Sequence, residues 1–505
     1  MPEDETVAAG QEAAVAALQS GRAVGEARSL RRIDTHISHL FLGRERAYKL
    51  KRAVRLPFAD FSTLEARRRA CEAELAVNRP LAPSLYLGVE ALARAPEGSL
   101  RLGGPGETVD WLVVMRRFAD GALFSEMADE GRLSPALVAE TVARFHAALP
   151  STELAGHAAD YRHTLDDLKR TEAEAAAALG LEAGAQALFE ALERALARQS
   201  PLIEARRRAG RVRRGHGDLH LANLCLFEGR VTPFDALEFD PALATTDVLY
   251  DLAFLLMDLH ARGLAAFANL AMNRYWDAAG EPEAALALLP PFMALRAAVR
   301  MAVATVAGDL DEAARYRRLG LELLHPHPVR LVAVGGLSGT GKSTLAAAIA
   351  FGLSGPCGAR LVRSDVIRKQ AAGVAVSIRL GQDAYAPAAR GAVYARLAEA
   401  ARAVLDAGSS AIADATFREA SARSAIEAAA GSHAFAGLWL TAPTAVRLAR
   451  VGTRTNDASD ATTAVAAEQH ETEPLGSNWR SLDASGSSES LADAARRSLG
   501  VSSAD

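Results

Sequence analysis

A stretch near the middle of the chain, HGDLHLAN at residues 216–223, holds two histidines, an aspartate and an asparagine. His216 and His220 have the i, i+4 spacing of zinc-binding histidines on a helix, but Gly217 disfavours a helix and the sequence offers no evident third ligand. We therefore do not expect a histidine metal site. We expect His216 to shape the loop through hydrogen bonds, which leaves the chemistry to the aspartate and the asparagine.

The aspartate and the asparagine of this stretch are followed by a second aspartate, after a short apolar hairpin with a Glu-Gly-Arg turn. Kinases of the eukaryotic type use this order: a catalytic loop supplies a base aspartate and a metal-binding asparagine, and the next strand supplies an aspartate that chelates Mg²⁺. By that order we expect Asp218 to be the base, and Asn223 and Asp235 to be the ligands of Mg²⁺.

A glycine-rich loop, GLSGTGKS at residues 336–343, lies between an apolar strand and an Ala/Leu-rich helix. It matches the pattern G-x-x-x-x-G-K-[ST], in which glycines let backbone N–H groups face bound phosphates at a helix N-terminus. In such a loop Lys342 reaches the β- and γ-phosphate oxygens and Ser343 holds Mg²⁺. The residues expected at the bound phosphates are Gly336, Gly339, Thr340, Gly341, Lys342, Ser343 and Thr344.

Two more aspartates end apolar strands that follow the glycine-rich loop, with helical stretches between them. Alternating strands and helices predict a parallel sheet whose strand C-termini line the site. We therefore expect Asp365 and Asp414 to face the phosphates. Asp414 stands where a carboxylate positions the water shell of Mg²⁺, and its alternative role is a helix cap after a strand end.

Over about residues 329–475 the chain resembles the small P-loop kinases of the polynucleotide kinase, gluconate kinase and zeta-toxin type. In these kinases an aspartate in an S-D-x-x-R setting accepts the proton of the substrate hydroxyl. The resemblance implies that Asp365 is the base and Arg368 a substrate clamp. It also implies that Arg450 and Arg454 are lid arginines at the transferring phosphate, although a solvated arginine face has the same pattern.

The first motif resembles the signature of the aminoglycoside phosphotransferase family, H-G-D-x-H-x-x-N followed by an apolar strand with an aspartate. With the segments AYKLK, CEAEL, VVMRRF and DVLYDLAFLLMDL, the resemblance covers nearly all of residues 35–475. It extends to a bacterial branch in which such a domain is fused to a P-loop kinase. The resemblance implies ATP and Mg²⁺ as cofactors, and it does not name the phosphate acceptor.

The segment AYKLK reads as a strand that presents Lys49 and Lys51 on one face, by the period of two. In the family a strand lysine here binds the α- and β-phosphates and pairs with a helix glutamate. We choose Lys49, with Lys51 as the alternative. The partner helix is expected to begin at Ser62, where S-T-L-E forms a capping box. It offers Glu74 or Glu72, which point to different sides of a helix.

The segment VDWLVVMRRF looks like the last strand of one lobe and the connection to the next. That reading places Met115 near the adenine edge of the nucleotide. No G-x-G-x-x-G loop precedes Lys49, which disfavours a protein kinase proper.

Composition and charge restrict the class of protein and of partner. The chain has 505 residues, more than one hydrophobic core usually supports, and 50% of them are hydrophobic, as in globular proteins. The formal net charge of −4 gives no overall attraction to nucleic acid or to an anionic membrane. The basic run at residues 206–215 lacks interleaved aromatic residues, so RNA binding is not favoured. A small-molecule hydroxyl acceptor is the expected partner.

Cysteine usage and the absence of targeting signals predict a cytoplasmic protein. The three cysteines have no CxxC spacing, and the acidic N-terminus lacks the basic region of a secretory signal. The most apolar run, residues 248–259, is too short to span a bilayer and carries two aspartates. We therefore expect no membrane association.

The predicted fold is multidomain: a two-lobed α+β protein-kinase-like domain, followed by an α/β P-loop NTPase domain with a parallel sheet. The predicted parts are an N-terminal helix or flexible segment at 1–24, the kinase-like domain at 25–320, a proline-bearing linker at 321–330, the P-loop domain at 331–475, and a Ser-rich tail at 476–505 that is disordered apart from a short helix.

The expected function is an ATP-dependent phosphotransferase with two nucleotide sites. The γ-phosphate would go to hydroxyl groups of an aminoglycoside-like sugar or metabolite and, at the P-loop domain, also to a nucleoside or a nucleic-acid end. The alternative is a sensor that binds ATP without transfer, which would need fewer carboxylates. A P-loop ATPase would want a glutamate beside Asp414, where Ala415 and Thr416 stand.

Overall fold

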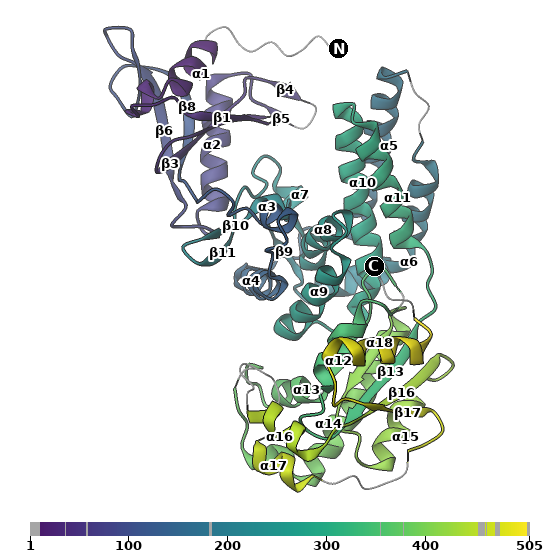
Figure 1. The fold of residues 1–505 in the computed structure, drawn as a ribbon. Helices are drawn as coiled ribbons and strands as arrows, with labels where there is room; N and C mark the ends of the chain where they lie inside the picture. The colour runs from purple at the N-terminus through teal and green to yellow at the C-terminus, as the bar shows by residue number, and fades with distance from the viewer. Residues whose placement is uncertain are drawn as a thin grey trace. The chain divides into compact units, whose positions relative to one another are not determined.

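The computed structural model describes residues 11–501 except residues 36, 57–58, 181–183, 354, 377, 453–459, 461 and 470–474. The chain forms two compact units, and each collects segments that are separated in sequence (Figure 1). Unit 1 contains residues 1–134, 148–155 and 210–251, and unit 2 contains residues 135–147, 156–209 and 252–505. The stretch 25–320, predicted as one domain, therefore contributes to both units.

Unit 1 is built on a six-stranded antiparallel sheet with the order β1-β2-β3-β8-β6-β7. Its strands are β1 (Arg31–Asp34), β2 (Ser38–Leu42), β3 (Arg46–Lys51), β6 (Tyr86–Arg94), β7 (Leu100–Leu102) and β8 (Glu107–Arg116). Strand β3 pairs with β2 on one side and β8 on the other, so the lysine-bearing segment AYKLK lies inside the sheet. Helix α1 (Gln11–Gln19) packs Ala14 and Leu18 into the same core.

Helix α2 (Leu64–Asn78) carries the two candidate glutamates of unit 1. Its cap is Thr63, whose hydroxyl accepts the N–H of Ala66 at 3.1 Å. The predicted cap at Ser62 is wrong by one residue. Ser62 belongs to the preceding turn, because its N–H and its hydroxyl both donate to Asp60 Oδ1, at 3.0 and 2.6 Å.

The hairpin predicted between the two motif aspartates is confirmed. Strand β10 (Leu224–Phe227) pairs antiparallel with β11 (Arg230–Pro233). The turn residues Glu228 and Gly229 have φ values of 50° and 73°, as a tight two-residue hairpin turn requires. A second short pair, β9 (Val212–Arg214) with β12 (Thr245–Asp247), flanks the motif.

The first part of unit 2 is helical. Its helices are α4 (Pro135–Ala148), α5 (Ala158–Ala178), α6 (Gln186–Arg208), α9 (Ala265–Ala279), η3 (Glu283–Leu288), α10 (Leu289–Ala307) and α11 (Leu310–Leu324), and α8 (Val248–Ala261) leads into it from unit 1. Within the described part of the chain, one stretch, Glu283–Ala307, is long and apolar enough to cross a membrane, but 72% of its most apolar window is buried inside the structure. Such burial is that of a core helix.

The second part of unit 2 is a five-stranded parallel sheet with the order β14-β15-β13-β16-β17. Its strands are β13 (Arg330–Gly336), β14 (Arg360–Arg363), β15 (Ala411–Asp414), β16 (Ala434–Thr441) and β17 (Trp479–Asp483), and its helices include α12 (Lys342–Ala350), α13 (Ser364–Ala371), α14 (Pro387–Asp406), α15 (Ala420–Ala429), α16 (Thr444–Gly452) and α17 (Thr463–Glu468). The predicted fold class, kinase-like lobes followed by an α/β P-loop domain with a parallel sheet, is confirmed.

The structure corrects both ends of the predicted linker. The linker expected at 321–330 is shorter, because α11 continues to Leu324 and β13 begins at Arg330. The helix stops there because Pro326 and Pro328 cannot continue it.

The tail at 476–505 is predicted to be disordered apart from a short helix; that helix is present, but the tail also contains a strand and is ordered over residues 476–501. Strand β17 pairs in parallel with β16, and helix α18 (Ser488–Leu499) follows it. The helix places Leu491, Ala492, Ala495 and Leu499 in the core of the parallel sheet. The tail contains few apolar residues, but they lie on one face of the helix. The composition of the whole segment does not reveal this arrangement.

A buried arginine joins the parallel sheet to the helical part of unit 2. Arg360 opens β14, and its guanidinium lies 2.8 Å from Asp277 Oδ1 of α9 and 3.0 Å from Glu283 Oε2 of η3. Asn273 of α9 accepts the N–H of Leu361 at 2.7 Å. Only 5% of the Arg360 side chain is exposed, so these ion pairs are shielded from water.

Replacing Arg360 by alanine is expected to lower the free energy of unfolding of unit 2 by about 3–5 kcal/mol, because two carboxylates would stay buried without a counter-charge. Denaturant unfolding of the full chain measures the change. Arg170→Ala is the matched control, since its pair with Asp167 is largely exposed and contributes little. Equal effects of the two substitutions would contradict the structural role of Arg360.

Candidate active sites

Strand β3 and helix α2 form the centre of the site in unit 1. Lys49 Nζ lies 3.0 Å from Glu74 Oε1 and 2.5 Å from Asp235 Oδ1. Burial alone would lower the pKa of Lys49, but the charges of Asp235 and Glu74 hold this pKa well above its usual value. Lys49 is therefore a permanent cation between two carboxylates. Lys51 lies behind it and also contacts Glu74, with Nζ 2.6 Å from Oε2.

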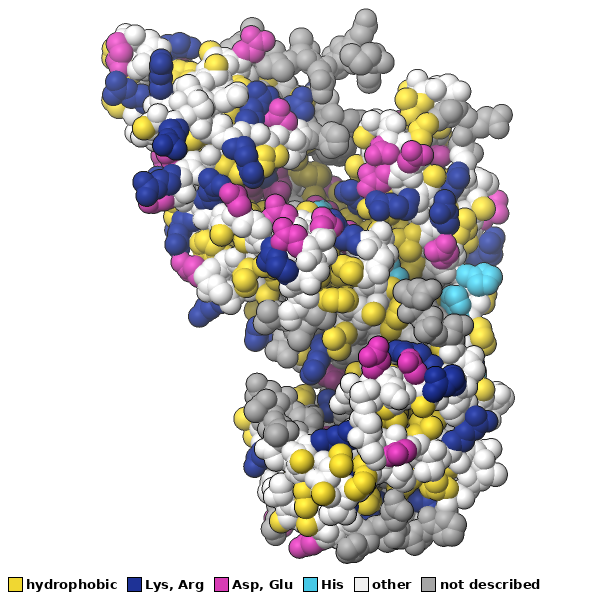
Figure 2. Space-filling view, viewed as in Figure 1, with side chains coloured by type: hydrophobic (Ala, Val, Ile, Leu, Met, Phe, Trp, Pro, Cys, Tyr) yellow, Lys and Arg dark blue, Asp and Glu magenta, His cyan; other side chains and the backbone are white. Residues whose placement is uncertain are grey.

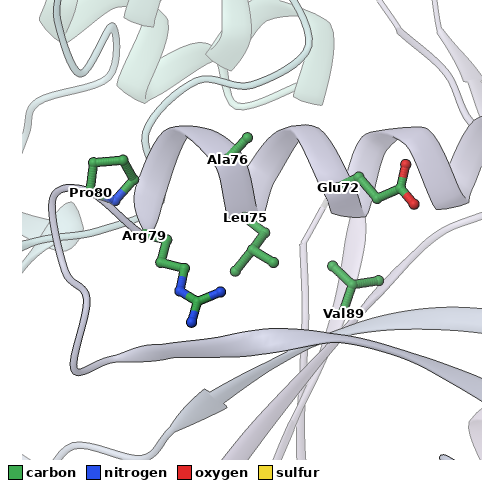
Figure 3. Close-up of a pocket in the computed structure, with 6 residues that line it drawn as sticks. All are labelled: Glu72, Leu75, Ala76, Arg79, Pro80 and Val89. Carbon is green, nitrogen blue, oxygen red and sulfur yellow. The ribbon is translucent and has the colours of Figure 1, made fainter.

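The choice between the two glutamates, which the sequence left open, is made by burial. Glu74 is fully buried against both lysines. Glu72 is exposed and contacts Arg68 at 3.5 Å. Figure 3 shows Glu72 and Leu75 on α2 facing a groove that Val89 of β6 also lines, and neither lysine is among the residues of this groove.

A cavity of about 140 Å³ opens beside Lys49. Apolar side chains of β2, β3 and β8 line it, together with the charged Lys49, Glu74 and Asp235. Met115 lies in its wall at the end of β8, in register with Ala47 of β3. Its wall also contains further charged residues, among them Arg31, Arg116 and Arg117. A cavity that combines apolar walls with charged groups suits a flat base with a phosphate tail.

The loop 216–223 carries Asp218 with about two fifths of its side chain exposed. Asn223 fixes it, since Asn223 Nδ2 donates to Asp218 Oδ2 at 2.8 Å and to the Asp218 carbonyl at 3.0 Å. As expected, His216 shapes the loop: its Nε2 donates to the carbonyl of Phe234 at 2.9 Å. Burial lowers the pKa of His216, which keeps it neutral.

Asp251 is a loop-holding residue that the sequence reading missed. Its carboxylate accepts the backbone N–H of His216 at 2.8 Å and that of Gly217 at 2.9 Å. Gly217 has φ +78°, and a Cβ there would lie 2.9 Å from Leu237 Cβ. Asp251 stands in the most apolar run of the chain, where a buried carboxylate is costly unless it is hydrogen-bonded.

The donor set of unit 1 fits a hard cation that arrives with a nucleotide. Among the residues that the structure describes, no group of three or more His, Cys, Asp and Glu side chains could hold a metal ion. The oxygens of Asn223 and Asp235 are of the kind that Mg²⁺ takes while it keeps waters and phosphate oxygens as further ligands. Two protein ligands, Asn223 and Asp235, are therefore enough for an Mg²⁺ ion whose other ligands are waters and phosphate oxygens.

The glycine-rich loop of unit 2 has the expected conformation. Gly336, Gly339 and Gly341 have φ values of +136°, +88° and +92°, and α12 begins with Lys342. A Cβ on Gly339 would lie 2.4 Å from the Arg447 carbonyl, so only glycine fits there. Lys342 Nζ donates to the carbonyl of Leu337 at 3.1 Å, within the loop.

Three other loop residues and one new residue complete the phosphate end of this site. Ser343 Oγ donates to Asp414 Oδ2 at 2.6 Å, so the two predicted Mg²⁺-side residues meet. Thr340 is buried with its hydroxyl on the Leu337 carbonyl, and Thr344 is exposed in the first turn of α12. Arg363, which the sequence reading did not single out, has its Nε 3.6 Å from Asp414 Oδ2.

The residues predicted to act on the acceptor, Asp365 and Arg368, both lie on α13. Asp365 is the second residue of this helix, and burial and the charge of Asp414 raise the pKa of its carboxyl. Arg368, one turn later, is buried, stacks on Tyr385 with its Cζ 4.5 Å from the ring centroid, and donates to the Ala384 carbonyl at 3.0 Å. Tyr385 in turn donates to Asp460 at 2.7 Å.

Of the two predicted lid arginines, the structure describes Arg450. Arg450 of α16 donates to the carbonyls of Ala484 at 2.8 Å and Gly486 at 3.2 Å. Its Nη1 lies 3.9 Å from the place of a Cβ on Gly341, so it is adjacent to the phosphate loop. Arg454 lies outside the described residues.

Transfer at the unit 2 site is expected to fall off, as the pH is lowered, at a pH above the usual titration of an aspartate near about 4. A base must be deprotonated, so with the raised pKa of Asp365 activity is present above that pKa and is lost as the pH falls through it. The pH profile of kcat/KM, which reports the free enzyme, measures it. A profile that is flat down to about pH 4 would contradict the assignment of Asp365 as base.

Comparisons with known proteins match both parts of the chain. A family model described as an AAA domain matches residues 331–474. The protein Rv2004c of Mycobacterium tuberculosis is 30% identical over 458 residues, which are 86% of this chain and 88% of that protein.

Two solved structures are each similar to a part of the chain. A choline/ethanolamine kinase family protein from Mesorhizobium loti is 16% identical, with 62% of this chain and 99% of that chain covered and a TM-score of 0.35. A gluconokinase from Sinorhizobium meliloti is 22% identical, with 35% of this chain and 94% of that chain covered and a TM-score of 0.26.

Proposed function

The chain belongs to the family of the Mycobacterium tuberculosis protein Rv2004c, and we propose that it is an ATP-dependent phosphotransferase with two nucleotide sites. The observation that carries the proposal is the ion-paired set of Lys49, Glu74 and Asp235 beside a cavity. Kinases use a strand lysine paired with a helix glutamate, next to a metal-binding aspartate, to hold ATP.

In unit 1, Lys49 would bind the α- and β-phosphates, and Asn223 and Asp235 would hold Mg²⁺. Asp218 orients the acceptor hydroxyl in line with the γ-phosphorus. The bond from the γ-phosphorus to the ADP oxygen breaks as the bond to the acceptor oxygen forms, and Asp218 takes the hydroxyl proton. The contact between Asn223 and Asp218 supports this arrangement, because it fixes the carboxylate before an acceptor arrives.

In unit 2, the loop N–H groups and Lys342 would bind the phosphates, and Ser343 and Asp414 would hold Mg²⁺. Asp365 would take the acceptor proton and Arg368 would contact the acceptor. The meeting of Ser343 and Asp414 supports this reading. At both sites Mg²⁺ bound with ATP would neutralise charge on the transferring phosphate.

We further propose small hydroxylated acceptors, such as aminoglycoside-like sugars or metabolites, in the cytoplasm. A nucleoside or nucleic-acid end remains an acceptor to test at unit 2. On the face shown in Figure 2, Lys and Arg side chains are interspersed with Asp and Glu side chains. Such mixing supports small acceptors, because polyanion binding is favoured by a continuous basic surface.

The test is transfer of labelled γ-phosphate from ATP with Mg²⁺ to a panel of aminoglycosides, sugars, nucleosides and RNA ends. Wild type, Asp218→Asn and Lys342→Ala are compared. A labelled acceptor that disappears in one variant alone assigns the chemistry to that site. Tight ATP binding with no labelled acceptor and no hydrolysis would overturn transfer and favour the nucleotide sensor.

A further inference from the structure

A second lysine and a second carboxylate lie behind the proposed nucleotide site of unit 1. Lys51 has a fully buried side chain, and its Nζ lies 2.5 Å from Glu238 Oε1 and 2.6 Å from Glu74 Oε2. Glu238 is itself 5% exposed in its side chain. The cavity beside Lys49 is lined by Lys49, Glu74 and Asp235, and Lys51 stands outside that lining. Lys51 is therefore buried outside the wall of this cavity.

The two lysine pairs form a ladder between one strand and one loop. Lys49 and Lys51 are two residues apart on β3, and they hold Asp235 and Glu238, which are three residues apart on the loop after β11. Glu74 lies between the lysines and contacts both. The loop that carries the proposed metal ligand is thus held to the sheet at two points.

Asp235 needs such support because its backbone is unusual. Its φ is +60°, a left-handed value that is uncommon for non-glycine residues, although aspartate adopts it more readily than most. The Asp235 N–H donates to Tyr86 Oη at 3.1 Å. The buried Asn78 accepts the N–H of Ala236 at 2.8 Å and donates to the Ala236 carbonyl at 3.3 Å. These bonds hold the start of the turn, and the Lys51–Glu238 pair holds its end.

We propose that Lys51 and Glu238 are positioning residues, which keep the 235–238 turn in the conformation that presents the Asp235 carboxylate to a divalent cation. The proposal rests on the proposed function of unit 1, and neither residue touches the nucleotide. Partners that orient a metal ligand from behind change metal affinity about 10–100-fold when they are removed.

The deciding variant replaces the pair as a whole. Substitution of Lys51 alone would leave the buried Glu238 without its cation and destabilise the fold, whereas loss of Glu238 alone leaves Lys51 paired with Glu74. Exchange of a buried ion pair for apolar residues of similar volume is often neutral. Lys51→Met combined with Glu238→Leu removes one positive and one negative charge, and it keeps the ion pair of Lys49 with Glu74. The double variant therefore tests the effect of the pair on metal binding without a large loss of stability.

The measurement uses the full chain in a Lys342→Ala background, so that unit 1 supplies the nucleotide site. ADP binding without metal and Mn²⁺ binding in the presence of ADP are followed by calorimetry. The double variant is expected to unfold at a midpoint close to that of its parent and to bind ADP alone within about twofold, but to bind Mn²⁺ at least about tenfold more weakly.

The matched control is Arg67→Met with Asp110→Asn. It removes another buried ion pair of unit 1, with a 2.8 Å contact, that has no bond to the 235–238 turn. Mn²⁺ affinity should not change in this control. Glu238→Gln is a milder second variant, for which a several-fold loss of Mn²⁺ affinity is expected.

Unchanged Mn²⁺ affinity in folded Lys51→Met/Glu238→Leu or in Glu238→Gln would overturn the positioning role. An equal loss in the Arg67 and Asp110 control would overturn it as well, because the effect would then be general. If the Lys342→Ala parent binds no nucleotide, the proposed function of unit 1 fails, and that result is distinct from a failure of positioning.

Discussion

Asparagine in place of Asp218 is expected to lower the rate of phosphate transfer at unit 1 by about a hundred- to ten-thousand-fold, the range for loss of a general base. The substitution keeps an oxygen that can accept the hydrogen bond from Asn223, so the loop should keep its shape. It removes the group that takes the acceptor proton. The measurements are the single-turnover rate with the identified acceptor and ATP affinity by calorimetry, and ATP affinity should change by less than about twofold.

Asp167→Asn is the control for Asp218→Asn, because it makes the same chemical change at an exposed carboxylate paired with Arg170. Its transfer rate should equal that of wild type. If Asp218→Asn retained the wild-type rate, Asp218 would not be the base, and the proposed chemistry of unit 1 would fall.

Alanine in place of Lys342 is expected to lower transfer at the unit 2 site by on the order of a hundred- to thousand-fold, as when one preorganised group that stabilises the transition-state charge is lost. Lys342 is the first residue of α12, and its ammonium stays inside the loop on the Leu337 carbonyl, ready to move to phosphate oxygens. Lys342→Arg should not restore activity, since a planar guanidinium does not replace a compact ammonium there. The rate of labelled transfer and ATP binding measure both changes.

The control for Lys342→Ala is Lys169→Ala, a lysine of the same unit that pairs with Glu193 and Asp166 on a helix surface. It should leave transfer and ATP binding unchanged. Similar losses in the two variants would point to a general effect on folding and against a phosphate-binding role for Lys342.

The parts of both sites that a short segment carries could be predicted from the sequence. The loop 216–223 and the glycine-rich loop 336–343 contain their own turns, because glycines stand where the backbone needs positive φ. Asn223 and Asp235 flank the two strands of one hairpin, in which Leu224 pairs with Pro233, so the hairpin brings the two residues close in space. The conformation of such segments depends mainly on nearby residues, so it can be predicted without knowledge of how distant elements pack.

Partners that come from elsewhere in the chain could not be predicted in the same way. Whether Glu72 or Glu74 contacts the lysines depends on which face of α2 packs on the sheet, and the spacing of the two glutamates does not reveal that face. Asp251 was hidden within an apolar run, and Tyr385 carries no motif at all. Such residues are recognised only when burial and contacts are known.

The error at the C-terminus has a related cause. A Ser-rich composition predicts disorder when apolar residues are averaged over the segment. Trp479 packs so closely on Gly437 that a Cβ there would lie 2.2 Å from its ring. A single large residue that packs against a glycine can hold a strand in a sheet. The average composition of the segment does not reveal such a contact.

Arg360 also limits how this chain can be recombined. In many multidomain proteins a linker joins parts that fold alone, so that a fusion can exchange one part for another. A foreign P-loop domain inserted after Leu324 would lack the guanidinium that Asp277 and Glu283 require. A viable exchange must therefore keep α9, η3 and β14 together, or supply a new partner for the two buried carboxylates.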